Sequence, residues 1–113
     1  MKIKALAGLL SVSGALLFSP LATAAVDASA AQALAKKEGC LKCHAIDKKK
    51  EGTPLKEISA KYKGKADAHE KILHQMTAGE KVKFADGTEE EHKVIKTKDK
   101  AEINNLIAWI LSL

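Results

Sequence analysis

The chain has only two cysteines, which lie three residues apart in the stretch "GCLKCHAID", and a histidine follows the second one directly. A disulfide between Cys40 and Cys43 would close a very small loop and would restrain the unfolded chain little. A structural zinc site needs four ligands, and the sequence has no second cysteine pair to complete one. A thioredoxin-like redox pair belongs in a β-α-β setting, and no strand-rich segment surrounds this motif.

The pattern Cys40-x-x-Cys43-His44 is instead the attachment motif for haem c. On one helical turn the two sulfurs face the same way, so both can form thioethers with one porphyrin edge. His44 lies four residues after Cys40 and can bring its imidazole onto the iron. The motif therefore predicts one covalent haem c, bound by Cys40 and Cys43, with His44 as the proximal iron ligand.

The N-terminal residues have the pattern of a secretory signal. Lys2 and Lys4 precede an uncharged apolar run, and Ala22-Thr23-Ala24 offers the small-x-small pattern of a signal-peptidase site. An uncleaved membrane anchor is the alternative, but two glycines and a proline interrupt the run, which is only just long enough to span a bilayer. We expect residues 1–24 to be a cleaved signal peptide and residues 25–113 to form the mature domain in the bacterial periplasm.

The length and charge of the expected mature chain indicate how many domains it forms and which partners suit it. Its length suits one domain, and a domain this small buries only about 60% of its unfolded surface, so a cofactor can supply part of the core. Without the two lysines of the signal, 17 of the 19 lysines oppose 14 acidic residues, and there is no arginine. This mild positive charge suits acidic partners but is too weak for a nucleic-acid binder. No second long apolar run follows, so no stable membrane insertion is expected.

Three stretches resemble a known family: "AQALAKKEGCLKCHAID", "LKEISAKYKGKADAHEKILHQMTAGE" and "TKDKAEINNLIAWILSL". From Ala28 onward the chain is similar to the small class I monohaem c-type cytochromes of bacteria. The resemblance implies an all-α fold of three to five helices wrapped around one covalent haem, with the first and last helices crossing near Gly39. It also implies a monomeric electron carrier that meets redox proteins in transient complexes.

The residue pattern supports helices independently. In the last stretch apolar side chains recur at helical spacing, at Ile103, Leu106, Ile107, Ile110 and Leu111. We expect Thr97 to be the N-cap of this helix, Asp99 to interact with its dipole, and Trp109 to pack in the core. Asp86-Gly87, between "KVKF" and "TEEEHKVI", indicates a turn or short hairpin.

The sixth iron ligand is less obvious, and the candidates downstream of the motif are His69, His74, Met76 and His92. The family usually supplies a methionine from a proline-containing loop before the last helix, whereas here that loop reads "EEEHKVIKTKDK". When the last helix is aligned on Trp109, His92 falls within one residue of the family's ligand. Met76 shares an apolar helix face with Ile72 and Leu73, which is the pattern of a core methionine. We therefore predict His44/His92 ligation, with Met76 as the alternative to His92.

This ligand choice has consequences for the haem. A second imidazole forgoes the rise in reduction potential that methionine gives, so we expect a lower potential than in methionine-ligated relatives. Without proline the loop should pack loosely and leave the haem edge exposed. Pro54 and Thr53 are both candidates to accept a hydrogen bond from the ring of His44 through their carbonyls.

Several lysines lie near the motif and the proposed ligand. They either steer acidic docking faces toward the haem or serve only solubility. These lysines are Lys42, Lys48, Lys49, Lys50, Lys93 and Lys96. The expected function is a one-electron shuttle between respiratory partners, and not an enzyme. The alternative is a haem-based gas sensor or a peroxidase-type enzyme in which the sixth ligand dissociates.

Overall fold

The computed structural model describes residues 14–15 and 25–113. The predicted signal peptide, residues 1–24, lies outside the described residues apart from two positions. In the described part of the chain the elements follow in the order α1 (Ala28–Lys37), a 3₁₀ turn η1 (Cys40–Lys42), α2 (Leu55–Tyr62), α3 (Ala68–Thr77), β1 (Lys81–Lys83), β2 (Glu89–Glu91) and α4 (Lys100–Ser112). The predicted helical fold is confirmed, with one small strand pair added to it. None of the helices in this part is long and apolar enough to cross a membrane.

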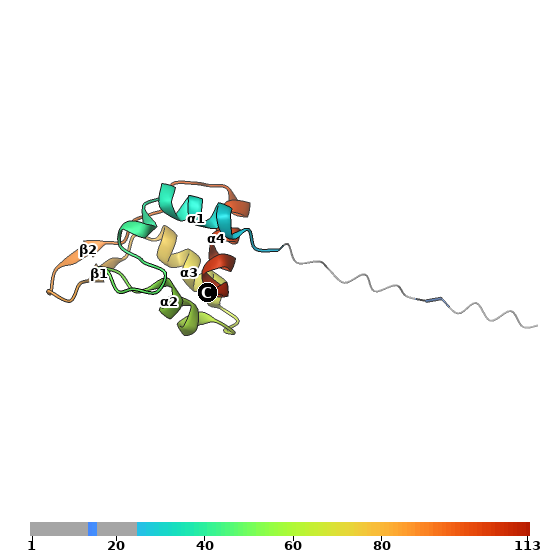
Figure 1. The fold of residues 1–113 in the computed structure, drawn as a ribbon, viewed down its shortest axis with the longest axis horizontal. Helices are drawn as coiled ribbons and strands as arrows, with labels where there is room; N and C mark the ends of the chain where they lie inside the picture. Colours follow the sequence, from blue (N-terminus) through green and yellow to red (C-terminus); the bar gives the residue numbers. More distant parts are fainter. Residues whose placement is uncertain (1–13, 16–24) are drawn as a thin grey trace, which may run out of the picture.

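Helices α1 and α4 lie against each other (Figure 1). Asp27 is the N-cap of α1, and its carboxylate accepts a hydrogen bond from the Ala30 N–H at 2.9 Å. Its small side chains Ala31 and Ala35 are buried in the core. Two hydrogen bonds between Asp27 and Asn105, of 2.9 and 2.8 Å, tie the start of α1 to α4. The N-cap of the first helix is therefore joined to the middle of the last helix.

Helix α4 supplies much of the core. Its predicted apolar stripe is buried at Ile103, Leu106, Ile107 and Ile110, and Trp109 is a core residue with 3% of its surface exposed. The predicted N-cap was wrong, because Asp99 rather than Thr97 accepts hydrogen bonds from the N–H groups of Ala101 and Glu102.

Thr97 lies just outside α4 and acts on the same helix start in another way. Its hydroxyl accepts from the Asp99 N–H at 3.2 Å and donates to the Glu102 carboxylate at 2.9 Å. The aspartate is closer to the first turn, so its oxygen reaches the unpaired N–H groups there.

The expected role of Gly39 was also wrong. Gly39 ends α1 in the left-handed conformation, with φ of 79°, and a Cβ at this position would lie 2.6 Å from the Lys93 amine. The left-handed backbone requires glycine here, since the end of the flexible Lys93 side chain can move aside, and no close approach of α4 is needed to explain it.

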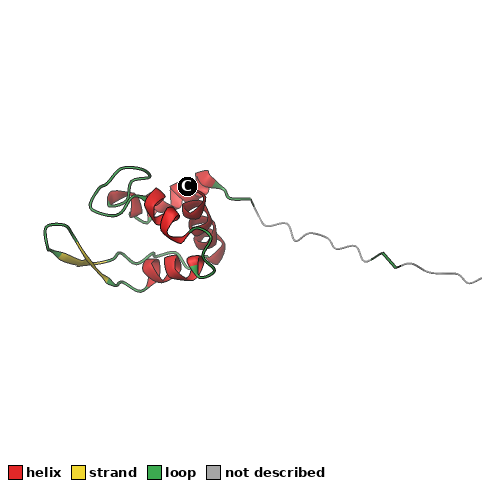
Figure 2. Ribbon diagram, turned by 90° about the horizontal axis from the view of Figure 1, so that it is seen from below, coloured by secondary structure: helices red, strands yellow, loops and turns green. Residues whose placement is uncertain are grey.

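The strand pair confirms the predicted hairpin, and it extends away from the helices (Figure 2). Strands β1 and β2 are antiparallel, with Val82 opposite Glu90 in the register. At the turn, the Asp86 carboxylate accepts from the N–H and hydroxyl of Thr88 at 2.9 and 2.6 Å, and these bonds lower the pKa of Asp86. Gly87 adopts φ of 88°, which a side chain would disfavour.

The segment after β2 is held more firmly than the missing proline led us to expect. The His92 N–H donates to the Glu80 carbonyl at 2.8 Å, and the Ile95 N–H donates to the Met76 carbonyl at 2.9 Å. The Ile95 side chain is buried, with 5% exposed. The expectation of a loosely packed loop was therefore wrong, because backbone hydrogen bonds and an apolar anchor replace the restraint that proline would give.

Candidate haem site

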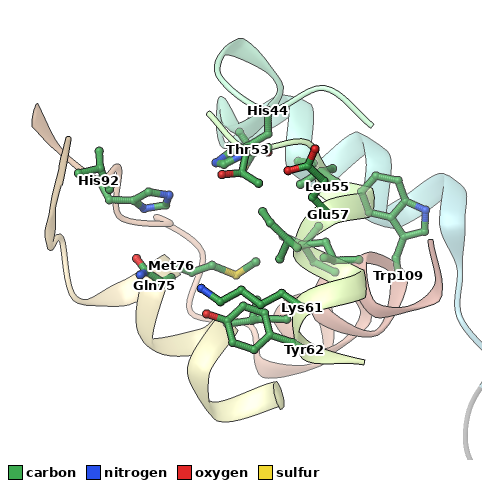
Figure 3. A pocket seen from close by; sticks show the side chains of 17 residues that line it. His44, Thr53, Leu55, Glu57, Lys61, Tyr62, Gln75, Met76, His92 and Trp109 are labelled. Carbon is green, nitrogen blue, oxygen red and sulfur yellow. Dashed lines mark hydrogen bonds between the residues drawn. The ribbon is translucent and has the colours of Figure 1, made fainter. Parts of the chain in front are cut away.

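A cavity of about 500 Å³ lies between α2, α3 and α4. Its apolar wall consists of Leu55, Ile58, Ile72, Leu106, Trp109 and Ile110. Figure 3 shows His44, His92 and Met76 pointing into it from different sides. Such a wall excludes water from a bound apolar group.

A second cavity, also about 500 Å³, adjoins the first, and the two share Cys40, His44, Thr53, Met76, Val82 and His92. The second cavity has a different character. Exposed charged side chains stand along it, namely Lys42, Glu51, Lys83, Glu90, Glu91 and Lys93. The two cavities together therefore form one space with an apolar half and a charged half near solvent. The two histidines lie between these halves.

His44 is positioned by the turn that precedes it and by one carbonyl. The His44 N–H donates to the Cys40 carbonyl at 2.9 Å, so cysteine and histidine belong to one tight turn. The His44 Nδ1 lies 2.6 Å from the Thr53 carbonyl oxygen. Because a carbonyl can only accept, Nδ1 carries the proton, and Nε2 keeps its lone pair for a metal. Of the two carbonyls left open by the sequence, the structure selects that of Thr53 over that of Pro54.

Gly52 makes room for this ring. A Cβ on Gly52 would lie 2.8 Å from His44 Cε1, 2.9 Å from His44 Nδ1 and 3.0 Å from the Cys43 carbonyl oxygen. The Gly52 N–H also donates to that carbonyl at 2.8 Å. Gly52 was not predicted from the sequence as a site residue, because a close contact between a loop glycine and a ring eight residues earlier leaves no mark in local spacing.

His92 faces His44 across the shared space. The two ring centroids are 6.1 Å apart, and the ring planes are inclined at 47°. When two imidazoles bind one metal ion from opposite sides, each metal–nitrogen bond is about 2 Å long. Each nitrogen lies roughly 1 Å from the centroid of its ring, so the two centroids should be roughly 6 Å apart. Nδ1 of His92 is buried and has no hydrogen-bond partner among the described residues. The site therefore fits a haem iron between the two rings.

The other sequence candidates differ in position. Met76 also lines both cavities, but it is 9% exposed and packs in the core with Ile72. His69 Nε2 lies 2.9 Å from the Asn104 side-chain oxygen, and His74 Nε2 lies 2.8 Å from a Glu80 carboxylate oxygen. Neither of these two histidines is among the residues that line the two cavities.

Cys40 and Cys43 lie at the edge of the site, and no disulfide joins them. Burial raises the pKa of the Cys40 thiol, and burial together with the Glu51 carboxylate raises the pKa of the Cys43 thiol. The Cys43 sulfur lies 3.7 Å from that carboxylate. Reactive redox cysteines have lowered pKa values, so these two do not have the electrostatic surroundings of a thioredoxin-type pair.

A helical domain with a Cys-x-x-Cys-His turn and a histidine opposite it defines a c-type haem protein. The family model for cytochrome c matches residues 28–113. Cytochrome c-551 of Allochromatium vinosum is 31% identical over 91 residues, covering 80% of this chain and 94% of the relative.

Two solved structures are also similar. The class 1 cytochrome MtoD of Sideroxydans lithotrophicus ES-1 is 53% identical with a TM-score of 0.74, covering 78% of this chain and 97% of that protein. Cytochrome c552 of Nitrosomonas europaea is 32% identical with a TM-score of 0.58, covering 73% of this chain and 98% of that protein. The chain belongs to the cytochrome c family: it is a class I monohaem electron carrier with one covalent haem c.

Gly52→Ala tests the fit around His44. The added methyl group must displace the ring or the backbone, so we expect a loss of about 1–3 kcal/mol in the free energy of unfolding. We also expect a changed axial-ligand signal in the EPR spectrum of the ferric protein. Gly64→Ala is the control for a glycine replacement without a close contact, because no atom lies within 4 Å of its added methyl group. Gly64 has φ of 79°, unlike Gly52, so this variant should lose about 1 kcal/mol through left-handed strain and keep the parental spectrum. Equal spectra for both variants would contradict the tight fit.

Proposed function

We propose that this protein is a periplasmic one-electron shuttle whose haem iron is held by His44 and His92. The haem supplies a one-electron Fe(III)/Fe(II) couple. The thiols of Cys40 and Cys43 form the thioethers, and their place on one tight turn with His44 suits attachment to a single porphyrin edge. The observation that carries the ligand assignment is the 6.1 Å separation of the two imidazoles across the cavity.

The residues around the proposed iron site differ between the His44 side and the solvent side. Thr53 holds the proton on Nδ1 of His44 and thereby fixes both the tautomer and the ring direction. The apolar wall of the first cavity would keep water from a haem held there, and the second cavity would offer it charged side chains near solvent. We infer an exposed haem edge on that side, which is the route by which electrons enter and leave.

Bis-imidazole ligation also sets the direction of the reduction potential. A thioether ligand favours ferrous iron, whereas a second imidazole and solvent near the haem favour the ferric charge. We therefore propose a potential below that of methionine-ligated relatives.

His92→Ala and His92→Met test the ligand assignment. Removal of the imidazole should abolish the bis-histidine EPR and near-infrared signals of the ferric protein. Methionine should raise the midpoint potential by more than about 59 mV, which is a tenfold shift for a one-electron couple.

His74→Ala and Met76→Leu are the matched controls for this test. His74 bonds to Glu80 outside the two cavities, so its loss should leave the axial-ligand spectrum unchanged. Met76→Leu keeps an apolar side chain of similar volume in the core. A parental spectrum for His92→Ala, together with an altered one for Met76→Leu, would assign the ligand to Met76 instead.

The alternative function is a gas sensor or a peroxidase-type enzyme, which needs an iron site that opens readily. The backbone hydrogen bonds at His92 and Ile95 favour the shuttle, because they restrain the segment that would have to move. Carbon monoxide added to the reduced protein should therefore leave its absorption spectrum unchanged. A rapid, tight spectral shift would favour the sensor or enzyme.

We propose that the partners are redox proteins with acidic faces and that the protein meets them as a monomer. Lys42 and Lys93 line the charged cavity, and Lys49 and Lys50 line a neighbouring groove. Carboxylates share this rim, including Glu51 and Glu90, so the steering should be moderate.

Small redox probes measure this steering directly. The rate of oxidation by anionic ferricyanide should fall about tenfold between low and high salt, the low end of the range for steered encounters. A cationic cobalt phenanthroline complex is the matched probe of opposite charge, and its rate should not fall. The same salt dependence for both probes would exclude a positive docking field at the haem.

We also propose export with cleavage after Ala24. Mass spectrometry of the periplasmic fraction should find a chain that begins at Ala25 and carries one haem. A chain retained in the membrane fraction with residues 1–24 intact would indicate an anchor instead.

A further inference from the structure

Glu38 is a buried carboxylate at the end of α1, with 5% of its surface exposed. One of its oxygens accepts from the Lys96 N–H at 2.7 Å, and the other accepts from the Thr97 N–H at 3.2 Å. Both donors belong to the segment that follows His92, and Glu38 itself lies two residues before Cys40. The carboxylate therefore links the haem-attachment turn to the segment that carries the opposite histidine.

A carboxylate at this position is unfavourable in free energy. Burial of a charge costs free energy unless hydrogen bonds compensate it, and the C-terminal end of a helix carries a partial negative charge that repels an anion. The two N–H bonds are charge-assisted and offset part of this cost. An apolar side chain would avoid the buried charge, but it would leave the N–H groups of Lys96 and Thr97 without these acceptors. The glutamate is therefore tied to the segment that carries these two donors.

The surroundings of His92 supply an explanation. The ring of His44 is fixed by its own hydrogen bond to Thr53, whereas Nδ1 of His92 is buried and has no partner among the described residues. No hydrogen bond from Nδ1 orients the His92 ring, so its position relies on side-chain packing and on the backbone that carries it. That backbone is held before the ring by the bond to Glu80, and after it by the bonds of Ile95 and Glu38.

We propose that Glu38 is a positioning residue for His92. Its carboxylate fixes the backbone after the histidine and thereby presents the imidazole to the iron, the task that the Thr53 carbonyl performs for His44. This inference rests on the proposed axial role of His92. A purely structural role would be that Glu38 only secures the start of α4.

Cyanide binding to the ferric holoprotein distinguishes the two roles, because cyanide competes with His92 for the iron. Glu38→Ala removes both acceptors and should raise the cyanide affinity by about tenfold, the effect expected when a buried charge-assisted contact is lost. Glu38→Gln keeps the shape and one acceptor oxygen, so its affinity should lie between those of the parent and Glu38→Ala. If Glu38→Ala does not fold, a rise of at least about threefold in Glu38→Gln decides in favour of the proposal.

Asp99→Ala is the matched control. Asp99 also accepts two backbone N–H bonds at the start of α4, but its bonds lie within the helix and not on the segment after His92. This variant should lower the urea midpoint and leave the cyanide affinity at the parental value. Glu38 variants that bind cyanide no more tightly than Asp99→Ala would overturn the positioning role.

His92→Ala separates this inference from the proposed function. If His92→Ala binds cyanide as weakly as the parent, His92 is not the ligand, and the proposed function fails first. If His92→Ala binds cyanide tightly while the Glu38 variants do not, only the role of Glu38 is wrong. With both correct, Glu38→Ala should add nothing in the His92→Ala background, since the two changes act through one ligand.

Discussion

The opposition of two imidazoles at 6.1 Å is the constraint on which the rest of the structure depends. His44 follows α1 after the short turn η1, whereas His92 lies between the hairpin and α4. Their separation can be kept only if those elements are held together, and the α1–α4 crossing does this through the core and through Asp27 and Asn105. The small apolar core is thus arranged around a space lined by both rings.

The two rings are held by different physical means. His44 depends on local chain geometry, namely the tight turn from Cys40, and on the nearby loop that brings Thr53 to its Nδ1. The His92 N–H donates one backbone hydrogen bond to the Glu80 carbonyl, and the more distant Glu38 carboxylate accepts two N–H bonds from the segment that follows His92. One side of the site therefore forms almost wherever the motif folds, while the other requires the complete tertiary structure.

Features set by neighbouring residues could be predicted from the sequence, whereas features set by distant contacts could not. The apolar stripe of α4 and the Asp86-Gly87 turn were predictable, because each is a pattern over a few neighbouring residues. The N-cap was not, since Thr97 and Asp99 are both good caps by type and only the path of the chain selects Asp99. The loop before α4 was expected to be loose for lack of proline, but its restraint comes from Met76 and Glu38, which lie far away in the sequence.

The sequence by itself determined the attachment chemistry, because Cys40, Cys43 and His44 need only one turn of chain to act together. It also determined the helices, whose period is local. Only the tertiary structure decided that the Thr53 carbonyl, and not that of Pro54, accepts from His44, that Gly52 must lack a side chain, and that Glu38 is buried against the segment after His92. These are contacts between segments whose separation depends on how the whole chain packs, and no local spacing encodes that packing.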